Sequence, residues 1–332
     1  MLRLSPEQAS VLQVRCCGGE MTSRLKRANW LRIAATFVLA VLASHEAKSQ
    51  ETDVMLTVRG HPLHFHILKG TGTPILFEAG GGDDATVWAG IVKPIHDITH
   101  ATLITYDRAG FGRSELTPDN QAIDAHGIEN GIEELEDALE QLGYNGDIVL
   151  VAHSYGALYA TLYAARHRSQ VKAAVFIDGS SACWFSDDWM KDFVHKQEGE
   201  DKPDARHLGN YYQSKNLPKT IDIVRAEPFP VSVPVIDLVS AHPPFSNQAD
   251  VDRWRECHRR FVDASRNREG LTALDTSHYI YRDNPDLVVK VIVKAYADAA
   301  DKQAALRILR RELDHSIEAA NRAKPELDAK HP

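Results

Sequence analysis

Short apolar runs, separated by amphipathic segments, make up most of the chain. Four of these runs have the length and composition of strands buried on both faces, and they cover residues 74–79, 101–106, 148–152 and 173–178. Between the second and third runs, apolar residues recur at steps of three and four, which predicts one buried helix face: Ile132, Leu135, Leu139 and Leu142. Strands that alternate with helices predict an α/β fold, with a mostly parallel central β-sheet flanked by helices.

The same pattern extends the predicted sheet at both ends. Residues 54–59 and 63–68 predict a hairpin with its turn at Gly60. Later in the chain two strands and two helices are expected, at residues 234–239 and 271–275 and at residues 248–266 and 286–299.

Residues 182–232 interrupt this alternation and are rich in Trp, Asp, Lys, His and Tyr. They predict a helical cap insertion over the active face. The core is then expected at residues 52–181 and 233–300, followed by a charged C-terminal tail at 301–332.

The first 49 residues have the pattern of a leader. A basic segment precedes eleven largely apolar residues, 33–43, which suit the core of a signal peptide and are short for a bilayer span. Residues 47–49 offer a small-x-small cleavage site, and Met21 is a second plausible start. We expect export to the periplasm or beyond the cell; the rival interpretation is an uncleaved N-terminal membrane anchor.

The net charge limits the classes of binding partner, and the cysteine content bears on a possible disulfide. The 332-residue chain has a net charge of −8, and removing residues 1–49 leaves 31 basic and 43 acidic residues, or −12. This balance argues against nucleic acid as a partner and against stable membrane association after leader cleavage. Cys183 and Cys257 remain, and either one disulfide or two buried thiols would fit.

The strongest chemical signal is the segment Ala152-His153-Ser154-Tyr155-Gly156, which joins the strand at 148–152 to a segment of helical composition at 157–165. A strand, a sharp turn with Ser at its tip and a helix form the geometry of a nucleophile elbow. Small residues two before and two after the Ser are needed because strand and helix pass close together. Ala152 replaces the usual first Gly and is still small.

A glycine cluster at residues 80–82 follows the strand at 74–79. Glycines at a strand's carboxyl end let backbone N–H groups point into a site, so we predict an oxyanion loop there. Trp88 follows closely and is predicted to line the substrate pocket, although a core position is the alternative.

Two other patterns are rejected as sites. Residues 107–114 lack the spacing of either phosphate-binding glycine motif, so we exclude nucleotide binding. His64 and His66 share one strand face but have no third ligand at metal spacing, so we expect solvent-facing histidines and no metal.

With these motifs in place the chain resembles the α/β-hydrolase fold family, in its cap-containing, serine esterase-like branch. The resemblance covers roughly residues 52–300 and rests on four motifs in the family's order: residues 78–82, 106–114, 152–156 and 277–280. It implies that Ser154 is the nucleophile, that His278 is its base and that the amides of Gly81 and Tyr155 form the oxyanion hole. It also implies that His153 is buried support and that no cofactor is needed.

The resemblance leaves the acid of the triad open. The family's usual position follows the strand after the cap, but the strand at 234–239 has no carboxylate at its tip. Asp237 lies inside that strand. Asp178, at the end of the strand after the elbow, occupies the alternative position used by some lipases of the fold and keeps the order Ser, acid, His. We favour Asp178 over Asp237.

The resulting expectation is an exported serine hydrolase that cleaves a small ester, thioester or lactone through an acyl-enzyme intermediate. Ser at the elbow argues against the epoxide hydrolases and haloalkane dehalogenases of the fold, which use Asp there. The alternatives are an aminopeptidase of the proline iminopeptidase type, with acidic cap residues holding a free amine, and a non-catalytic ligand-binding member of the fold. The acidic residues in question are Asp187, Asp188 and Asp192.

Overall fold

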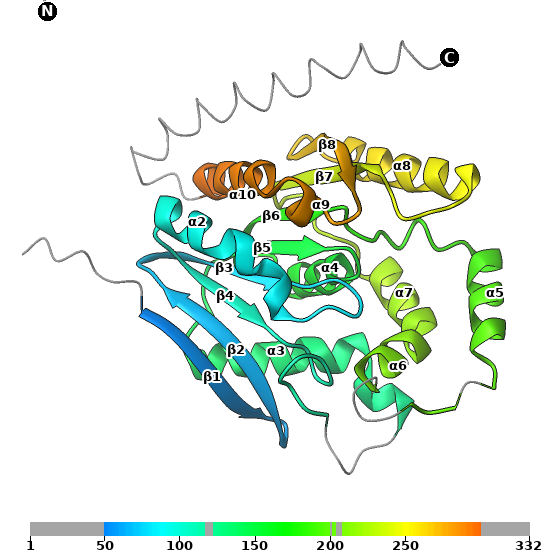
Figure 1. The fold of residues 1–332 in the computed structure, drawn as a ribbon, viewed down its shortest axis with the longest axis horizontal. Helices are drawn as coiled ribbons and strands as arrows, with labels where there is room; N and C mark the ends of the chain where they lie inside the picture. Colours follow the sequence, from blue (N-terminus) through cyan, green and yellow to red (C-terminus); the bar gives the residue numbers. More distant parts are fainter. Residues whose placement is uncertain (1–49, 117–121, 200, 204–207, 300–332) are drawn as a thin grey trace, which may run out of the picture. The chain divides into compact units, whose positions relative to one another are not determined.

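The computed structural model describes residues 50–299, except 117–121, 200 and 204–207 (Figure 1). The predicted leader and C-terminal tail lie outside the described residues. Within this part of the chain, eight strands form one sheet in the order β1-β2-β4-β3-β5-β6-β7-β8. Their bounds are β1 Gln50–Val58, β2 His61–Lys69, β3 Gly72–Glu78, β4 Ala101–Tyr106, β5 Ile148–His153, β6 Val171–Ile177, β7 Val235–His242 and β8 Arg268–Ser277.

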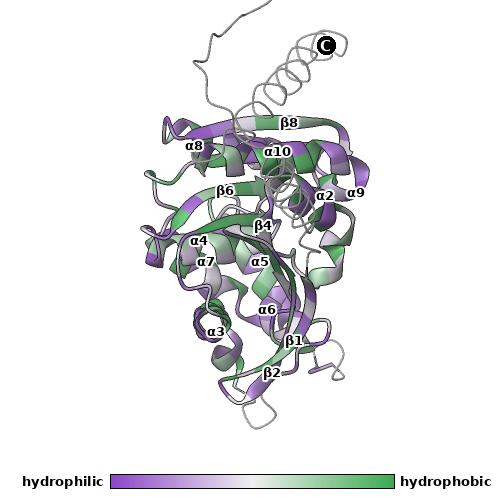
Figure 2. Cartoon of the chain, turned by 90° about the vertical axis from the view of Figure 1, so that its left-hand side faces the viewer, coloured by the Kyte–Doolittle hydropathy of each residue, from purple (hydrophilic) through white to green (hydrophobic). Residues whose placement is uncertain are grey.

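The direction of the strands confirms the predicted α/β fold with a mostly parallel sheet. β1 pairs with β2, and β2 with β4, in antiparallel fashion, whereas every later pair from β3·β4 to β7·β8 is parallel. The central strands β4 and β5 are buried along their whole length, because helices cover both faces of the sheet. Figure 2 shows the apolar residues that run along β4 and β6.

Two apolar layers separate the sheet from its helices. One face packs against α3 (Ile128–Leu142), α4 (Gly156–Arg166), α7 (Leu217–Ala226) and α8 (Gln248–Asp263). The other face packs against α2 (Ala89–Thr99), α9 (Ile280–Asp283) and α10 (Pro285–Ala299). Two 3-10 turns, η1 (Ala85–Trp88) and η2 (Ile123–His126), precede α2 and α3.

The predicted elements are present, and their bounds differ by up to four residues, as at β1, which begins at Gln50 where residue 54 was predicted. β8 runs from Arg268 to Ser277, beyond the expected 271–275, because its first residues pair with the start of β7. The helix expected at 248–266 ends at Asp263. α3 ends at Leu142, and Gly143 caps it with a left-handed φ of 78°.

The segment 182–232, here called the cap segment, contains α5 (Asp187–Gln197), α6 (Leu208–Lys215) and α7. α6 lies against the glycine cluster: a Cβ placed on Gly81 would be 2.8 Å from Nε2 of Gln213, and one on Gly82 would be 3.2 Å from Oδ1 of Asn210. α5 has no buried residue and lies farther out (Figure 1).

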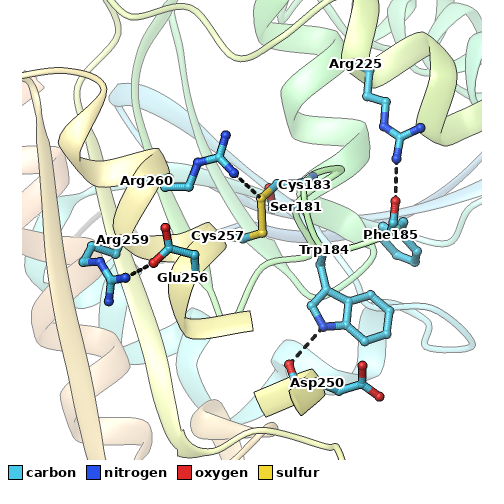
Figure 3. Close-up of a disulfide and its surroundings, with 10 residues drawn as sticks. All are labelled: Ser181, Cys183, Trp184, Phe185, Arg225, Asp250, Glu256, Cys257, Arg259 and Arg260. Carbon is cyan, nitrogen blue, oxygen red and sulfur yellow. Dashed lines mark hydrogen bonds and ion pairs between the residues drawn. A yellow bond between two sulfur atoms is a disulfide. The ribbon is translucent and has the colours of Figure 1, made fainter. Parts of the chain in front are cut away.

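The two cysteines left open by the sequence form a disulfide. Cys183 and Cys257 have a Cα–Cα distance of 5.8 Å, and their bond ties the start of the cap segment to α8 (Figure 3). The two cysteines are 74 residues apart in the sequence.

The prediction for His64 was wrong, because its side chain is buried and bonded. Its Nδ1 lies 2.9 Å from Oδ2 of Asp107, which also accepts hydrogen bonds from the amides of Ala85 and Arg113. His64 therefore helps to hold the turn after β4. None of the described helices is both long and apolar enough to span a membrane.

Candidate active site

Ser154 lies at the tip of the sharp turn between β5 and α4, with a left-handed φ of 50°. Few non-Gly residues adopt this backbone conformation, and such strain clusters at functional sites. The close approach that the sequence predicted is present at Gly156, where a Cβ would be 2.4 Å from the carbonyl oxygen of Glu78. The turn therefore presents the Ser154 side chain at the carboxyl end of the sheet, as a nucleophile elbow requires.

His278 follows β8 and contacts Ser154 directly. Its Nε2 lies 2.9 Å from Oγ of Ser154. Its backbone is held by His153, whose Nε2 donates to the His278 carbonyl oxygen over 3.0 Å. Burial, and then the nearby His278, lower the pKa of His153 to about 3. His153 is thus a neutral, buried support, as the sequence predicted.

Asp178 completes a chain of hydrogen bonds from Ser154. It follows β6 with a φ of 45°, its side chain is fully buried, and its Oδ2 lies 2.7 Å from Nδ1 of His278. Three other donors reach the same carboxylate: the amide of Ser240 at 3.0 Å, its hydroxyl at 2.8 Å and Nε1 of Trp254 at 3.1 Å. Burial alone would raise the pKa of Asp178, but the hydrogen bond and charge of His278 and the Ser240 amide lower it overall. The carboxylate stays charged, as an acid that stabilises an imidazolium must.

The structure does not bring Asp237 to His278. Asp237 lies within β7, opposite Phe176 of β6, and is fully buried. Its Oδ2 is bonded to Nδ1 of His258 on α8, over 2.7 Å. Of the two candidate acids, Asp178 is therefore the one in hydrogen-bond contact with His278.

The amides of Gly81 and Tyr155 lie on neighbouring loops, as an oxyanion hole requires. A Cβ placed on Gly81 would be 3.4 Å from Cβ of Tyr155. No described residue accepts a hydrogen bond from either amide, so both donors are free to bind a developing oxyanion.

A buried arginine holds the backbone at the start of the glycine cluster. Arg108 donates from Nη1 to the carbonyl oxygen of Ala79 over 2.7 Å and from Nη2 to that of Gly80 over 2.5 Å. It also pairs with Glu78 at 3.5 Å, and burial raises the pKa of Glu78 to about 7 despite this cation. Because the carbonyls of Ala79 and Gly80 are held inward, the direction of the next amide, that of Gly81, is fixed.

Trp88 does not line the site, contrary to the prediction. Its side chain is fully buried and packs on Phe77 and Tyr281, at centroid distances of 5.3 and 5.2 Å. Trp88 is the last residue of η1, on the face of the sheet that α2 and α10 cover. It is part of the core there and is not accessible to a substrate.

Four residues around the site were not predicted from the sequence: Arg108, Gln213, Ser240 and Trp254. Trp254 lies in the helix that the sequence predicted at 248–266, and nothing in the sequence pairs its indole with Asp178. Among the described residues, no group of three His, Cys, Asp or Glu side chains could hold a metal ion.

Comparison with known proteins places the fold. A family model described as alpha/beta hydrolase fold matches residues 73–320. The uncharacterized protein YqjL of Bacillus subtilis is 25% identical over 260 residues, which are 78% of this chain and 98% of that protein. The proline iminopeptidase of Saccharolobus solfataricus is 27% identical over 133 residues, 40% of this chain and 42% of that enzyme.

Among solved structures, the thermophilic esterase from Thermogutta terrifontis superposes with a TM-score of 0.58 at 18% identity. The match covers 75% of this chain and 99% of the esterase. At this identity the likeness concerns the fold alone.

Proposed function

The chain belongs to the α/β-hydrolase fold family, and we propose that it is a serine hydrolase that cleaves a small ester, thioester or lactone through an acyl-enzyme intermediate. The observation that carries the proposal is the continuous hydrogen-bonded chain from Ser154 through His278 to Asp178. A serine hydroxyl is a poor nucleophile at neutral pH, and a base at 2.9 Å is what activates it.

The reaction follows from the positions of these atoms. Nε2 of His278 takes the Ser154 proton as Oγ attacks the acyl carbon, and Asp178 stabilises the imidazolium through Nδ1. The negative charge on the former carbonyl oxygen is bound by the amides of Gly81 and Tyr155. His278 then returns the proton to the departing alcohol or thiol, and a water molecule activated by the same histidine releases the acid.

The cap segment supports a small acyl group. Gln213 on α6 reaches the glycine cluster, so the space above the oxyanion amides is limited on that side. Oε1 of Gln213 is buried and has no hydrogen-bond partner in the described part of the chain. A polar group of the substrate beside the scissile bond would supply that partner.

The aminopeptidase alternative receives less support from the structure. It needs buried or convergent carboxylates to hold a free amine, but Asp187 and Asp188 have side chains 85% and 94% exposed. They lie on α5, which has no buried residue. The similarity to a proline iminopeptidase covers less than half of either chain.

Labelling with a fluorophosphonate tests the mechanism. The wild-type chain should be modified on Ser154 and should lose turnover of p-nitrophenyl acetate in proportion to labelling. Ser154→Ala should be neither labelled nor active, while Ser180→Ala, a neighbouring serine outside the triad, should keep both properties. If the folded wild-type protein did not react, the proposal of a serine hydrolase would be wrong, and a non-catalytic, ligand-binding member of the fold would be favoured.

A further inference from the structure

A cavity of about 530 Å³ lies behind the proposed catalytic acid, on the face of the sheet covered by α4 and α8. Its walls come from β6, β7, α4, α7, α8 and the loop 179–183, and they include neither Ser154 nor His278. Its volume is in the range of small-molecule sites, which hold a mostly apolar ligand with a few polar contacts.

One wall of the cavity is aromatic. Phe176, Phe229 and Phe261 line it, and the Phe176 ring lies 5.3 Å from that of Phe229 and 5.5 Å from that of Phe261, centroid to centroid. Phe176 and Phe229 are buried. These rings offer a surface for an aromatic or branched apolar group.

A buried ion pair with unused bonding capacity forms part of another wall. Asp237 and His258 line the cavity and are bonded through Oδ2 and Nδ1, with 0% and 6% of their surface exposed. Oδ1 of Asp237 and Nε2 of His258 are buried, and neither has a hydrogen-bond partner among the residues that the structure describes. Burial alone would lower the pKa of His258, but the Asp237 carboxylate raises it overall, so the ring can carry a proton on Nε2 as well. Such a donor, facing away from Asp237, calls for an acceptor.

Two arginines line the cavity at its exposed side. Arg260 contacts Sγ of Cys183 at 3.8 Å, beside Ser181, and has no carboxylate partner among the described residues (Figure 3). Arg225 donates to the carbonyl oxygen of Phe185 (Figure 3) and pairs with Asp187 and Asp222 at 3.8 and 3.6 Å, so its charge is balanced. Asp237 is the one acidic residue of the lining, and His258 balances its charge. Among the described residues, Arg260 is therefore the cation of the lining that has no carboxylate partner, and it adds one positive charge to an otherwise apolar cavity.

We propose that this cavity binds an organic monocarboxylate with an aromatic or branched apolar body. The carboxylate accepts hydrogen bonds from Nε2 of His258 and from Arg260, and the body packs on Phe176 and Phe229. The ligand class follows from the lining and does not depend on turnover at Ser154.

Calorimetric titration with 4-phenylbutyrate tests the site, on the full chain carrying Ser154→Ala so that no turnover interferes. We expect one binding site, and weaker binding of the uncharged 4-phenylbutyramide. Arg260→Gln should weaken binding of the carboxylate by about tenfold, the low end for a hydrogen bond to a charged group. Arg259→Gln is the matched control: this neighbour on α8 pairs with Glu256, does not line the cavity, and should change affinity by less than about twofold.

A second variant places the ligand inside the cavity. Val224→Phe adds volume from α7 into the space and should abolish binding while leaving labelling of Ser154, in the otherwise wild-type chain, unchanged. If Val224→Phe does not fold, the contrast between Arg260→Gln and Arg259→Gln decides. Absence of binding, or binding that ignores Arg260→Gln, would overturn the proposal. Loss of Ser154 labelling in the wild type would instead concern the hydrolase mechanism alone.

Discussion

The choice between Asp178 and Asp237 can be tested by two isosteric substitutions, Asp178→Asn and Asp237→Asn. Asp178 accepts four hydrogen bonds, including the one from Nδ1 of His278. An asparagine offers one acceptor oxygen and an NH₂ group in place of the other, so at least one of the four donors then faces another donor. The ring of His278 loses the partner that keeps its proton on Nδ1 and leaves Nε2 free to accept.

The expected magnitude separates the two variants clearly. Asp178→Asn should lower kcat by about 10⁴, as the same change does in other triads, which is about 5.4 kcal/mol of transition-state stabilisation. Asp237→Asn leaves the triad intact, so kcat should stay within about threefold of wild type. It should instead lower the free energy of unfolding by about 3 kcal/mol, because His258 loses its buried counter-charge.

The assay is turnover of a series of p-nitrophenyl esters of increasing acyl length, with fluorophosphonate labelling rate as a second readout. Urea unfolding of both variants measures stability and shows whether a loss of activity reflects unfolding. If Asp237→Asn lost activity while folded and Asp178→Asn kept it, the assignment of the acid would be wrong.

Three further predictions concern the supports of the site. Arg108→Lys removes the fork that holds two loop carbonyls and should lower kcat by about 10², measured with the same esters; an unchanged kcat would exclude this role for Arg108. Cys257→Ser should lower the free energy of unfolding by about 4 kcal/mol, from the chain entropy of a 74-residue separation, and urea unfolding with and without reductant checks it. Burial lowers the pKa of His153 from 6.5 to about 3, so the free energy of unfolding has its full value above pH 6.5. It should decrease as the pH falls from 6.5 towards 3, because in this range the unfolded chain binds a proton at His153 and the folded chain does not. Between pH 7 and 4.5 the free energy of unfolding should fall by about 2.5 kcal/mol from this group, and His153→Gln should remove that part of the pH dependence in urea unfolding.

The sheet could be predicted from the sequence because parallel strands buried on both faces need continuous apolar runs. Residues 148–152 are such a run, and the structure buries all of β5. The elbow could be predicted for a related reason. Its strained turn leaves room only for small residues on either side of Ser154, and the sequence has Ala152 and Gly156 there.

The acid and the pocket could not be settled in this way, because they depend on contacts between distant segments. Asp178 is held by Ser240 and Trp254, which lie 62 and 76 residues away in the chain. The wrong prediction for Trp88 has the same cause, because its position also depends on a contact with a distant segment. Its nearness in sequence to the glycine cluster suggested a pocket residue, but η1 directs it into the core against Tyr281.

The strand after the cap segment still serves the site, although its own carboxylate does not reach His278. Ser240, near the end of β7, gives its amide and its hydroxyl to Asp178, so the neighbouring strand supplies two of the four donors that keep this acid charged. Asp237, three residues earlier, is turned to His258 instead. Because α8 carries both Trp254, which bonds Asp178, and His258, the proposed active site and the proposed carboxylate cavity share one helix, which the disulfide ties to the loop that follows Asp178. A carboxylate bound at His258 would therefore act on the same helix that helps to position the acid.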